Sequence, residues 1–130
     1  ISQRTDKNLI IAGEVPSANE FILSKDIMIV PILSGSGVRV KIIEGMALGK
    51  TIITTTIGAE GLAVENGKNI LIADTPEEFV EAIAKCVHTP DICAILGENA
   101  RNFVALNHNN EVITQNLTEF YEALIHNENK

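Results

Sequence analysis

The residues best suited to chemistry lie within residues 31–56, where a glycine-rich turn precedes a helix that carries a lysine and a glutamate. The turn, 34–37, follows the apolar run Ile27–Leu33 and leads into residues whose spacing predicts a helix over 38–48. The first N–H groups of such a helix have no partner within it, and the helix dipole favours negative charge beside them. This layout predicts a site for the anionic part of a phosphate-linked ligand.

Two side chains of the expected helix extend this interpretation. Glu44 lies seven residues after Gly37, which places both on one helix face with the carboxylate roughly 10 Å below the helix start. Lys41 lies between them. A diphosphate at the turn would have Lys41 beside it, and Glu44 could accept hydrogen bonds from ribose hydroxyls. The spacing therefore indicates a nucleotide-diphosphate site, although a solvated ion pair between the two side chains explains it equally well.

The turn does not fit two widespread phosphate-binding motifs. After Gly35 and Gly37, Val40 occupies the third glycine position of the dinucleotide-binding fingerprint. A P-loop needs Gly-Lys-Ser/Thr directly after its glycines, and that sequence does not follow this turn. A dinucleotide-binding site and a P-loop nucleotide site are both excluded here.

Composition indicates one ordinary globular domain over residues 1–130. Hydrophobic residues make up 45% and charged residues 21%, and the formal net charge is −7. An acidic chain is unsuited to nucleic acid or an anionic membrane surface, because either would need a positive field. The first residue is isoleucine rather than methionine, so we expect the chain to be part of a longer protein.

No residue cluster in the sequence calls for a metal. Cys86 and Cys93 have the wrong spacing for a Cys-x-x-Cys pair or a tetrahedral zinc site. Both fall on expected helix faces, which predicts buried or half-buried free thiols in a reducing compartment. The histidines are scattered near helix ends and loops, so we predict neither a metal nor a cofactor.

Apolar runs and helical segments alternate along the chain, as expected of an α/β domain with a short, covered parallel sheet. A strong helix start at Thr75 combines an N-cap, Pro76 at the first helical position and Glu78 completing a capping box. Gly49 suits the end of the second helix. The predicted strands are Leu9–Ala12, Ile27–Leu33, Thr51–Thr55 and Ile70–Ala73, and the predicted helices are Pro16–Ser24, Val38–Leu48, two beginning near Thr75 and Thr89, and Asn110–Ile125.

These residues carry a family resemblance. The pattern Gly-x-Gly-x-Arg-x-Lys-x-x-Glu over 35–44, followed by Gly-Ala-Glu-Gly-Leu over 58–62, resembles the donor-binding half of family 4 (group 1) glycosyltransferases of the GT-B fold. The likeness covers nearly the whole chain, and the central block is specific. It implies a Rossmann-like three-layer α/β/α architecture, as part of a C-terminal domain that binds a nucleoside-diphosphate sugar.

The resemblance also implies roles for individual residues. Glu44 matches the acid that binds the donor ribose, and the glycine turn matches the loop whose amides hold the diphosphate and sugar. Ser36 stands where many members carry a second glutamate, and Asn110 stands near a position where relatives often carry tryptophan. The predicted donor-binding residues are Gly35, Ser36, Gly37, Val38, Arg39, Lys41 and Glu44, with Ser34, Thr55 and Glu60 as further candidates.

The implied reaction is retaining transfer of a sugar, of hexosyltransferase type, from the nucleoside diphosphate to an acceptor hydroxyl. The acceptor, a saccharide or a lipid-linked molecule, would be bound by a missing N-terminal part, so we expect this chain alone to be inactive. The alternatives are a sugar-nucleotide epimerase of the same fold and a non-catalytic nucleotide-binding or assembly module. Release of the nucleoside diphosphate only in the presence of an acceptor would separate transfer from epimerisation.

The resemblance further implies a bacterial protein of polysaccharide biosynthesis that works in the cytoplasm or at the periphery of the inner membrane. No apolar stretch approaches the length needed to span a membrane. With part of the family's sheet missing, we also expect an unpaired strand edge beside Ile27–Val30 or Leu9–Ala12, through which a homodimer would form.

Overall fold

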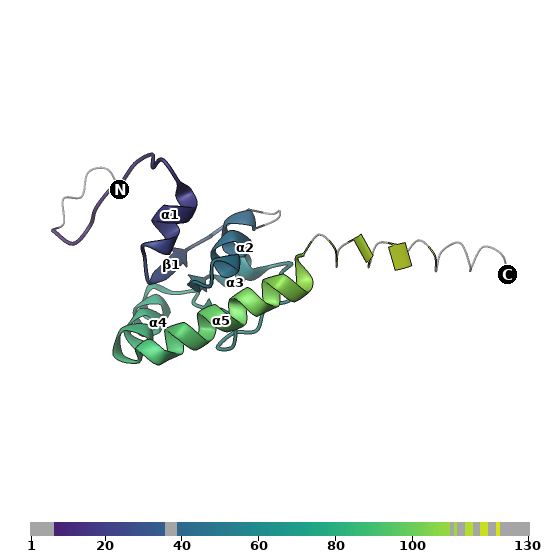
Figure 1. The fold of residues 1–130 in the computed structure, drawn as a ribbon. Coiled ribbons are helices and arrows are strands. Elements are labelled where there is room, and N and C mark those ends of the chain that lie inside the picture. Colours follow the sequence, from purple (N-terminus) through teal and green to yellow (C-terminus); the bar gives the residue numbers. More distant parts are fainter. Residues whose placement is uncertain are drawn as a thin grey trace.

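The structure is a computed structural model that describes residues 7–35, 39–109, 111, 114–115, 118–119 and 122. It contains a parallel sheet with the strand order β1-β2-β3, and Figure 1 shows the helices that surround this sheet. The strands are β1 (Ile27–Val30), β2 (Thr51–Thr54) and β3 (Leu71–Ile72), and the helices are α1 (Ala18–Leu23), α2 (Val40–Ala47), α3 (Thr56–Ala59), α4 (Pro76–His88) and α5 (Pro90–Asn107).

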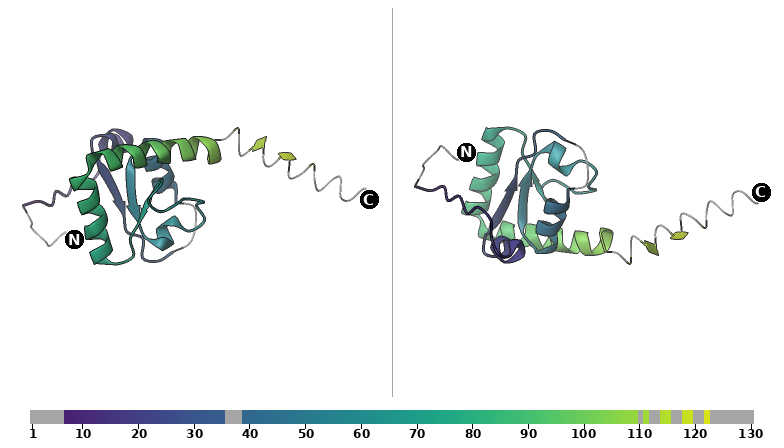
Figure 2. Two further views of the ribbon diagram at one scale, coloured as in Figure 1. Left: turned by 90° about the horizontal axis from the view of Figure 1, so that it is seen from below. Right: turned by 90° about the horizontal axis from the view of Figure 1, so that it is seen from above.

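The central strand, β2, is buried along its whole length. Neighbouring side chains of a strand point to opposite faces of the sheet, so Ile52 and Ile53 enter different parts of the core. Ile52 packs in a cluster with Ile42 and Met46 of α2, whereas Ile53 packs in a cluster with Cys86 of α4. Figure 2 shows the sheet between these two helices. The predicted α/β, Rossmann-like fold is confirmed.

Helix α5 completes the domain by crossing the amino ends of the strands (Figure 2). Leu96 joins the cluster on the α4 side and Ala100 joins the cluster on the α2 side. The hydroxyl of Thr51, at the start of β2, donates to the carbonyl oxygen of Cys93 at 2.9 Å. Helix α5 therefore contacts the core clusters on both faces of the sheet and the start of its central strand.

Most predicted element boundaries agree with the structure. The capping box at the start of α4 is present, with Glu78 N–H donating to Thr75 Oγ1 at 3.2 Å and Thr75 N–H donating to the Glu78 carboxylate at 3.1 Å. Strand β1 ends at Val30 rather than at Leu33, because Pro31 has no N–H to donate to a ladder. The described positions of the predicted last helix are helical, and the others lie outside the described residues.

The predicted strand Leu9–Ala12 is wrong. These residues have no regular secondary structure, and the side chain of Ile10 is 87% exposed. An apolar run becomes a strand only where a neighbouring strand can pair with its backbone, and β1 pairs only with β2 in the described part of the chain. The edge of β1 away from β2 thus carries no partner there, and the expected homodimer stays a prediction.

No helix within the described ranges is long and apolar enough to cross a membrane.

Candidate functional site

The predicted site residues that the structure describes lie near the carboxyl edge of the parallel sheet. The glycine turn follows β1, α3 follows β2, and Asp74 closely follows β3. Ligands of open α/β sheets bind in the crevice outside this edge. Ser36, Gly37 and Val38 were predicted to bind the donor, and they lie outside the described residues.

Two buried threonines fix the chain where it leaves β1. Thr54 Oγ1 donates to the carbonyl oxygen of Val30 at 2.7 Å, and Thr55 Oγ1 donates to the carbonyl oxygen of Ile32. Thr55 Oγ1 also accepts from the N–H of Gly58 at 3.0 Å, which caps α3. Although Thr55 was a candidate ligand contact, the structure places its hydroxyl below the surface, where main-chain groups engage it on both sides.

At the start of the glycine turn, Gly35 adopts a backbone conformation that suits glycine. Its φ of +116° is one that residues with a Cβ rarely adopt. Its carbonyl oxygen accepts a hydrogen bond from Nη2 of Arg39 at 2.8 Å. The neighbouring Ser34, a further candidate, is exposed. Gly35 and Arg39 therefore meet across the turn.

Helix α2 begins at Val40, two residues later than predicted, and its N-cap residue makes no side-chain capping bond. The N–H groups of Ile42 and Ile43 donate to the carbonyl oxygen of Arg39, at 3.0 and 3.1 Å, so the N–H groups before them are the ones that this helix start offers to an anion. Ile42 and Met46 are buried on the core side of α2, whereas Lys41 and Glu44 are exposed. The two predicted ligand-binding side chains thus face solvent beside the helix start.

Lys41 and Glu44 form a long ion pair, with 3.9 Å between Nζ and Oε2. Their side chains are 70% and 45% exposed. Exposed pairs of this kind contribute less than about 1 kcal/mol, because water screens them. Little free energy is therefore lost when either side chain leaves the ion pair to bind a ligand.

The α3 turn contributes a contact that the sequence did not predict. The Asp74 carboxylate accepts from the backbone N–H of Thr56 at 2.7 Å and from its hydroxyl at 2.6 Å. The hydroxyl bond, followed by the backbone bond, lowers the pKa of Asp74 from its ordinary value. The signal for this contact in the sequence is an aspartate directly before the N-cap Thr75. Asp74 ties the end of β3 to the start of α3.

Glu60 ends α3 and is exposed. It borders a shallow hollow of about 340 Å³ at the same edge of the sheet, and Thr56 and Ile57 line that hollow too. The structure therefore places Glu60 on a surface open to ligands, on the next βα connection after the glycine turn.

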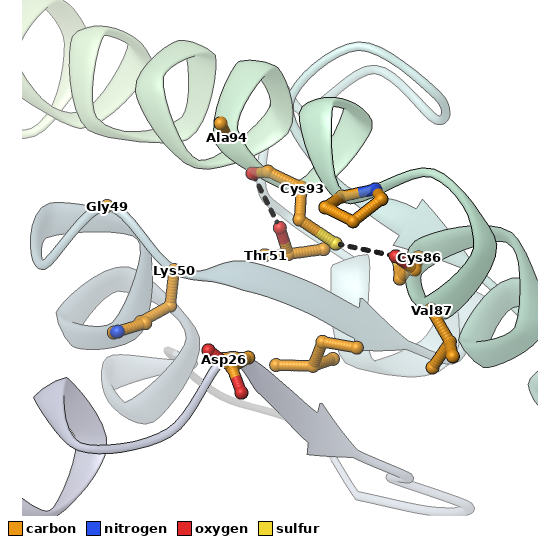
Figure 3. Close-up of a pocket in the computed structure, with 10 residues that line it drawn as sticks. Asp26, Gly49, Lys50, Thr51, Cys86, Val87, Cys93 and Ala94 are labelled. Atoms are coloured by element: carbon orange, nitrogen blue, oxygen red, sulfur yellow. Dashed lines mark hydrogen bonds between the residues drawn. The ribbon is translucent and has the colours of Figure 1, made fainter.

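Another hollow, of about 480 Å³, lies at the opposite edge of the sheet (Figure 3). It is lined by the starts of β1 and β2 and by the α4–α5 junction, and no predicted donor-binding residue borders it. Lys50 at its rim donates to the carbonyl oxygens of Leu23 and Lys25, at 3.0 and 2.6 Å, so this ammonium group is engaged by the end of α1. We assign the candidate site to the carboxyl edge, where the start of α2 lies beside the exposed charges of Lys41 and Glu44.

In the described ranges, no group of His, Cys, Asp and Glu side chains is arranged to hold a metal ion. Cys86 is buried and Cys93 half-buried, and both are free thiols, as predicted.

We expect Cys86 to resist thiol reagents in the folded protein. Burial, reinforced by the neighbouring Cys93, raises the pKa of its thiol from 9.0 to about 12, so little reactive thiolate forms near neutral pH. Mass spectrometry after brief alkylation at pH 8 should find Cys93 modified well before Cys86. Equal labelling rates of the two cysteines would contradict the burial of Cys86.

The same pKa shift predicts how stability depends on pH. Above pH 9 the Cys86 thiol loses its proton in the unfolded state before it does so in the folded state, so Cys86 should lower the stability of the fold as the pH rises toward 12.

Replacing Gly58 with alanine should destabilise the protein by about 2 kcal/mol through overpacking. A Cβ at this position would lie 2.0 Å from Thr54 Oγ1, the atom that holds the Val30 carbonyl. Urea denaturation measures the loss. In a Thr54→Ala background the same substitution should cost less than half as much, whereas additive losses would show that the clash is not the cause.

Comparison with known proteins gives consistent matches. The family described as "Glycosyl transferases group 1" matches residues 1–89. Two uncharacterized glycosyltransferases of Methanocaldococcus jannaschii are similar to this chain. One is 28% identical over 106 residues, which cover 80% of this chain and 27% of the relative. The other is 32% identical over 85 residues, which cover 64% of this chain and 24% of the relative. The chain thus spans about a quarter of the length of these relatives. No solved structure matches it.

Proposed function

The chain belongs to the group 1 glycosyltransferases, and from that membership we propose that its carboxyl-edge site binds the nucleoside-diphosphate sugar donor. The observation that carries the proposal is the start of α2, where uncapped N–H groups lie next to exposed Lys41 and Glu44. An anion at the helix start gains from the N–H donors and the dipole, and Lys41 adds a full charge. Glu44, one turn further on, is placed to accept hydrogen bonds from the ribose.

We assign the chemistry of this site to stabilising the leaving group. In the transfer, the bond between the anomeric carbon and the diphosphate oxygen breaks, and the acceptor oxygen bonds to that carbon with retention of configuration. The proton of the acceptor hydroxyl passes to the departing diphosphate. The diphosphate leaves with the electron pair of the broken bond. Donors already aimed at the diphosphate stabilise the charge that develops there without giving up a proton of their own. In this proposal Lys41 and the N–H groups before and within the first turn of α2 carry that role.

The acceptor would be a saccharide or a lipid-linked molecule, bound by a part of the protein outside this chain. The curated relatives are several times longer than the matched region, which leaves room for such a part. These relatives are archaeal, so the expected bacterial source and polysaccharide pathway stay predictions.

A donor screen tests the proposal directly. Calorimetric titration of the full-length protein with UDP-, GDP-, ADP- and TDP-sugars should identify one that binds clearly more tightly than the others. Release of that nucleoside diphosphate should then depend on an added acceptor. Binding of none of these donors would contradict the proposal, and release without an acceptor would favour epimerisation or hydrolysis over transfer.

A further inference from the structure

Arg39 lies between two segments that belong to different βα connections. Its Nη2 donates to the carbonyl oxygen of Gly35 at 2.8 Å and to that of Ile57 at 3.2 Å. The second contact reaches 18 residues along the chain, from the residue before α2 to the middle of α3. One nitrogen atom thus joins the glycine turn to the connection that follows β2.

The carbonyl of Ile57 also determines where α3 ends. It accepts from the N–H of Glu60 at 3.3 Å, so Arg39 and Glu60 share one acceptor. Glu60 then leaves the helix with an extended backbone, at φ −57° and ψ 131°. A shift of the Ile57 carbonyl would therefore carry Glu60 with it.

Helix α3 needs such support, because four residues form too few internal hydrogen bonds to be stable alone. Its start is fixed by the Thr55 hydroxyl and the Asp74 carboxylate. Arg39 donates to the carbonyl oxygen of Ile57, which also accepts the N–H of Glu60 at the end of the helix. Loss of Arg39 should therefore free the end of α3 while its start remains attached.

The guanidinium group is also oriented differently from a phosphate-binding fork. Bidentate recognition of a phosphate uses two adjacent N–H groups that are open to the ligand. Here Nη2 is engaged by two carbonyls, and Nε is buried with no hydrogen-bond partner among the described residues. Lys41, on the exposed side of α2, is the cation available to a diphosphate.

We propose that Arg39 is a positioning residue that fastens the α3 turn to the glycine turn, so that Glu60 is held at the edge of the donor site. The contact with Gly35 and Ile57 exists without a ligand, whereas the role of Glu60 rests on the proposed donor binding. The two parts can be tested separately.

The first experiment measures amide hydrogen exchange in the ligand-free, full-length protein. Arg39→Met keeps the side-chain bulk but removes the donor, and we expect exchange of the Glu60 amide and its neighbours to Leu62 to accelerate at least tenfold. Lys41→Met removes the same charge two residues away and should leave these rates unchanged. Unchanged rates in Arg39→Met, or equal acceleration in both variants, would overturn the positioning role.

The second experiment is a double-mutant cycle with the donor found by the screen. Glu60→Gln should weaken donor binding at least fivefold in the wild-type background and less than twofold in the Arg39→Met background, because Glu60 is then no longer held in place. Additive effects, or no effect of Glu60→Gln alone, would overturn the link to the donor. If no donor binds the wild type, the proposed function fails, while the exchange rates still decide the Arg39 contact.

Discussion

Replacing Gly97 with alanine is expected to lower the free energy of unfolding by about 3 kcal/mol, at the upper end of the usual cost of overpacking. A Cβ on Gly97 would lie 2.1 Å from the carbonyl oxygen of Gly49 and 3.0 Å from its carbonyl carbon. These are backbone atoms, so no side chain can rotate away. Helix α5 would have to move off the turn between α2 and β2, and the packing between α2 and α5 would be lost along with it.

The sign of this effect makes the test sharp. Alanine in the middle of a helix normally stabilises by about 1 kcal/mol relative to glycine, so a destabilised variant must overcome that gain. Gly49→Ala is the matched control on the other side of the contact. Its Cβ would lie 3.7 Å from the carbonyl oxygen of Gly97, which is an ordinary contact distance. The expected loss of about 1–2 kcal/mol therefore comes mainly from the left-handed φ of +71° at this position. Urea denaturation should rank Gly97→Ala clearly below Gly49→Ala, and a Gly97→Ala protein as stable as wild type would show that α5 does not approach so closely.

Elements with local signals could be predicted from the sequence. The start of α4 depends on Thr75, Pro76 and Glu78, which lie within four residues of one another, and the structure has the expected capping box. The run around Ile52 and Ile53 predicted a strand buried on both faces, and β2 is that strand. In each case the determining contacts are close in the sequence or follow from the period of the apolar residues.

Elements that depend on distant partners could not be predicted in the same way. The apolar residues of Leu9–Ala12 look like a strand by composition, but strand formation depends on an edge that the sequence does not reveal. Three of the four residues of α3, Thr56, Ile57 and Gly58, form helices less readily than alanine, and the turn is held by Asp74 and Arg39 from elsewhere in the chain. Short elements of this kind are determined by tertiary contacts rather than by their own sequence.

The same distinction applies to the candidate site. Spacing predicted that Lys41 and Glu44 lie together on α2, and the structure places them on one exposed face. Spacing could not predict that Arg39 turns toward the carbonyls of Gly35 and Ile57, because that contact requires α3 to exist first. The sequence alone does not distinguish a basic residue that binds a ligand at a glycine turn from one that hydrogen-bonds to the loop itself.

Glu44→Gln should weaken donor binding by about 1–3 kcal/mol, which is roughly a 5- to 150-fold loss of affinity, because charge-assisted hydrogen bonds to the ribose become neutral ones. The substitution also breaks the ion pair with Lys41, which leaves that ammonium group free for the diphosphate and offsets a small part of the loss. An exposed pair with 3.9 Å between its atoms contributes less than about 1 kcal/mol, so the weaker ribose contact should dominate. Calorimetry with the donor and thermal unfolding measure the two effects separately.

Glu81→Gln provides the control for charge, because Glu81 is an exposed glutamate of α4, on the other side of the sheet from α2. It should leave both donor affinity and melting temperature unchanged, whereas Glu44→Gln should change affinity alone. The opposite pattern for Glu44→Gln, with unchanged affinity and a sharp fall in melting temperature, would mean that the carboxylate supports α2 rather than the ligand. Its exposed position argues against that outcome, since a side chain that is 45% exposed and paired only at 3.9 Å adds little to folding.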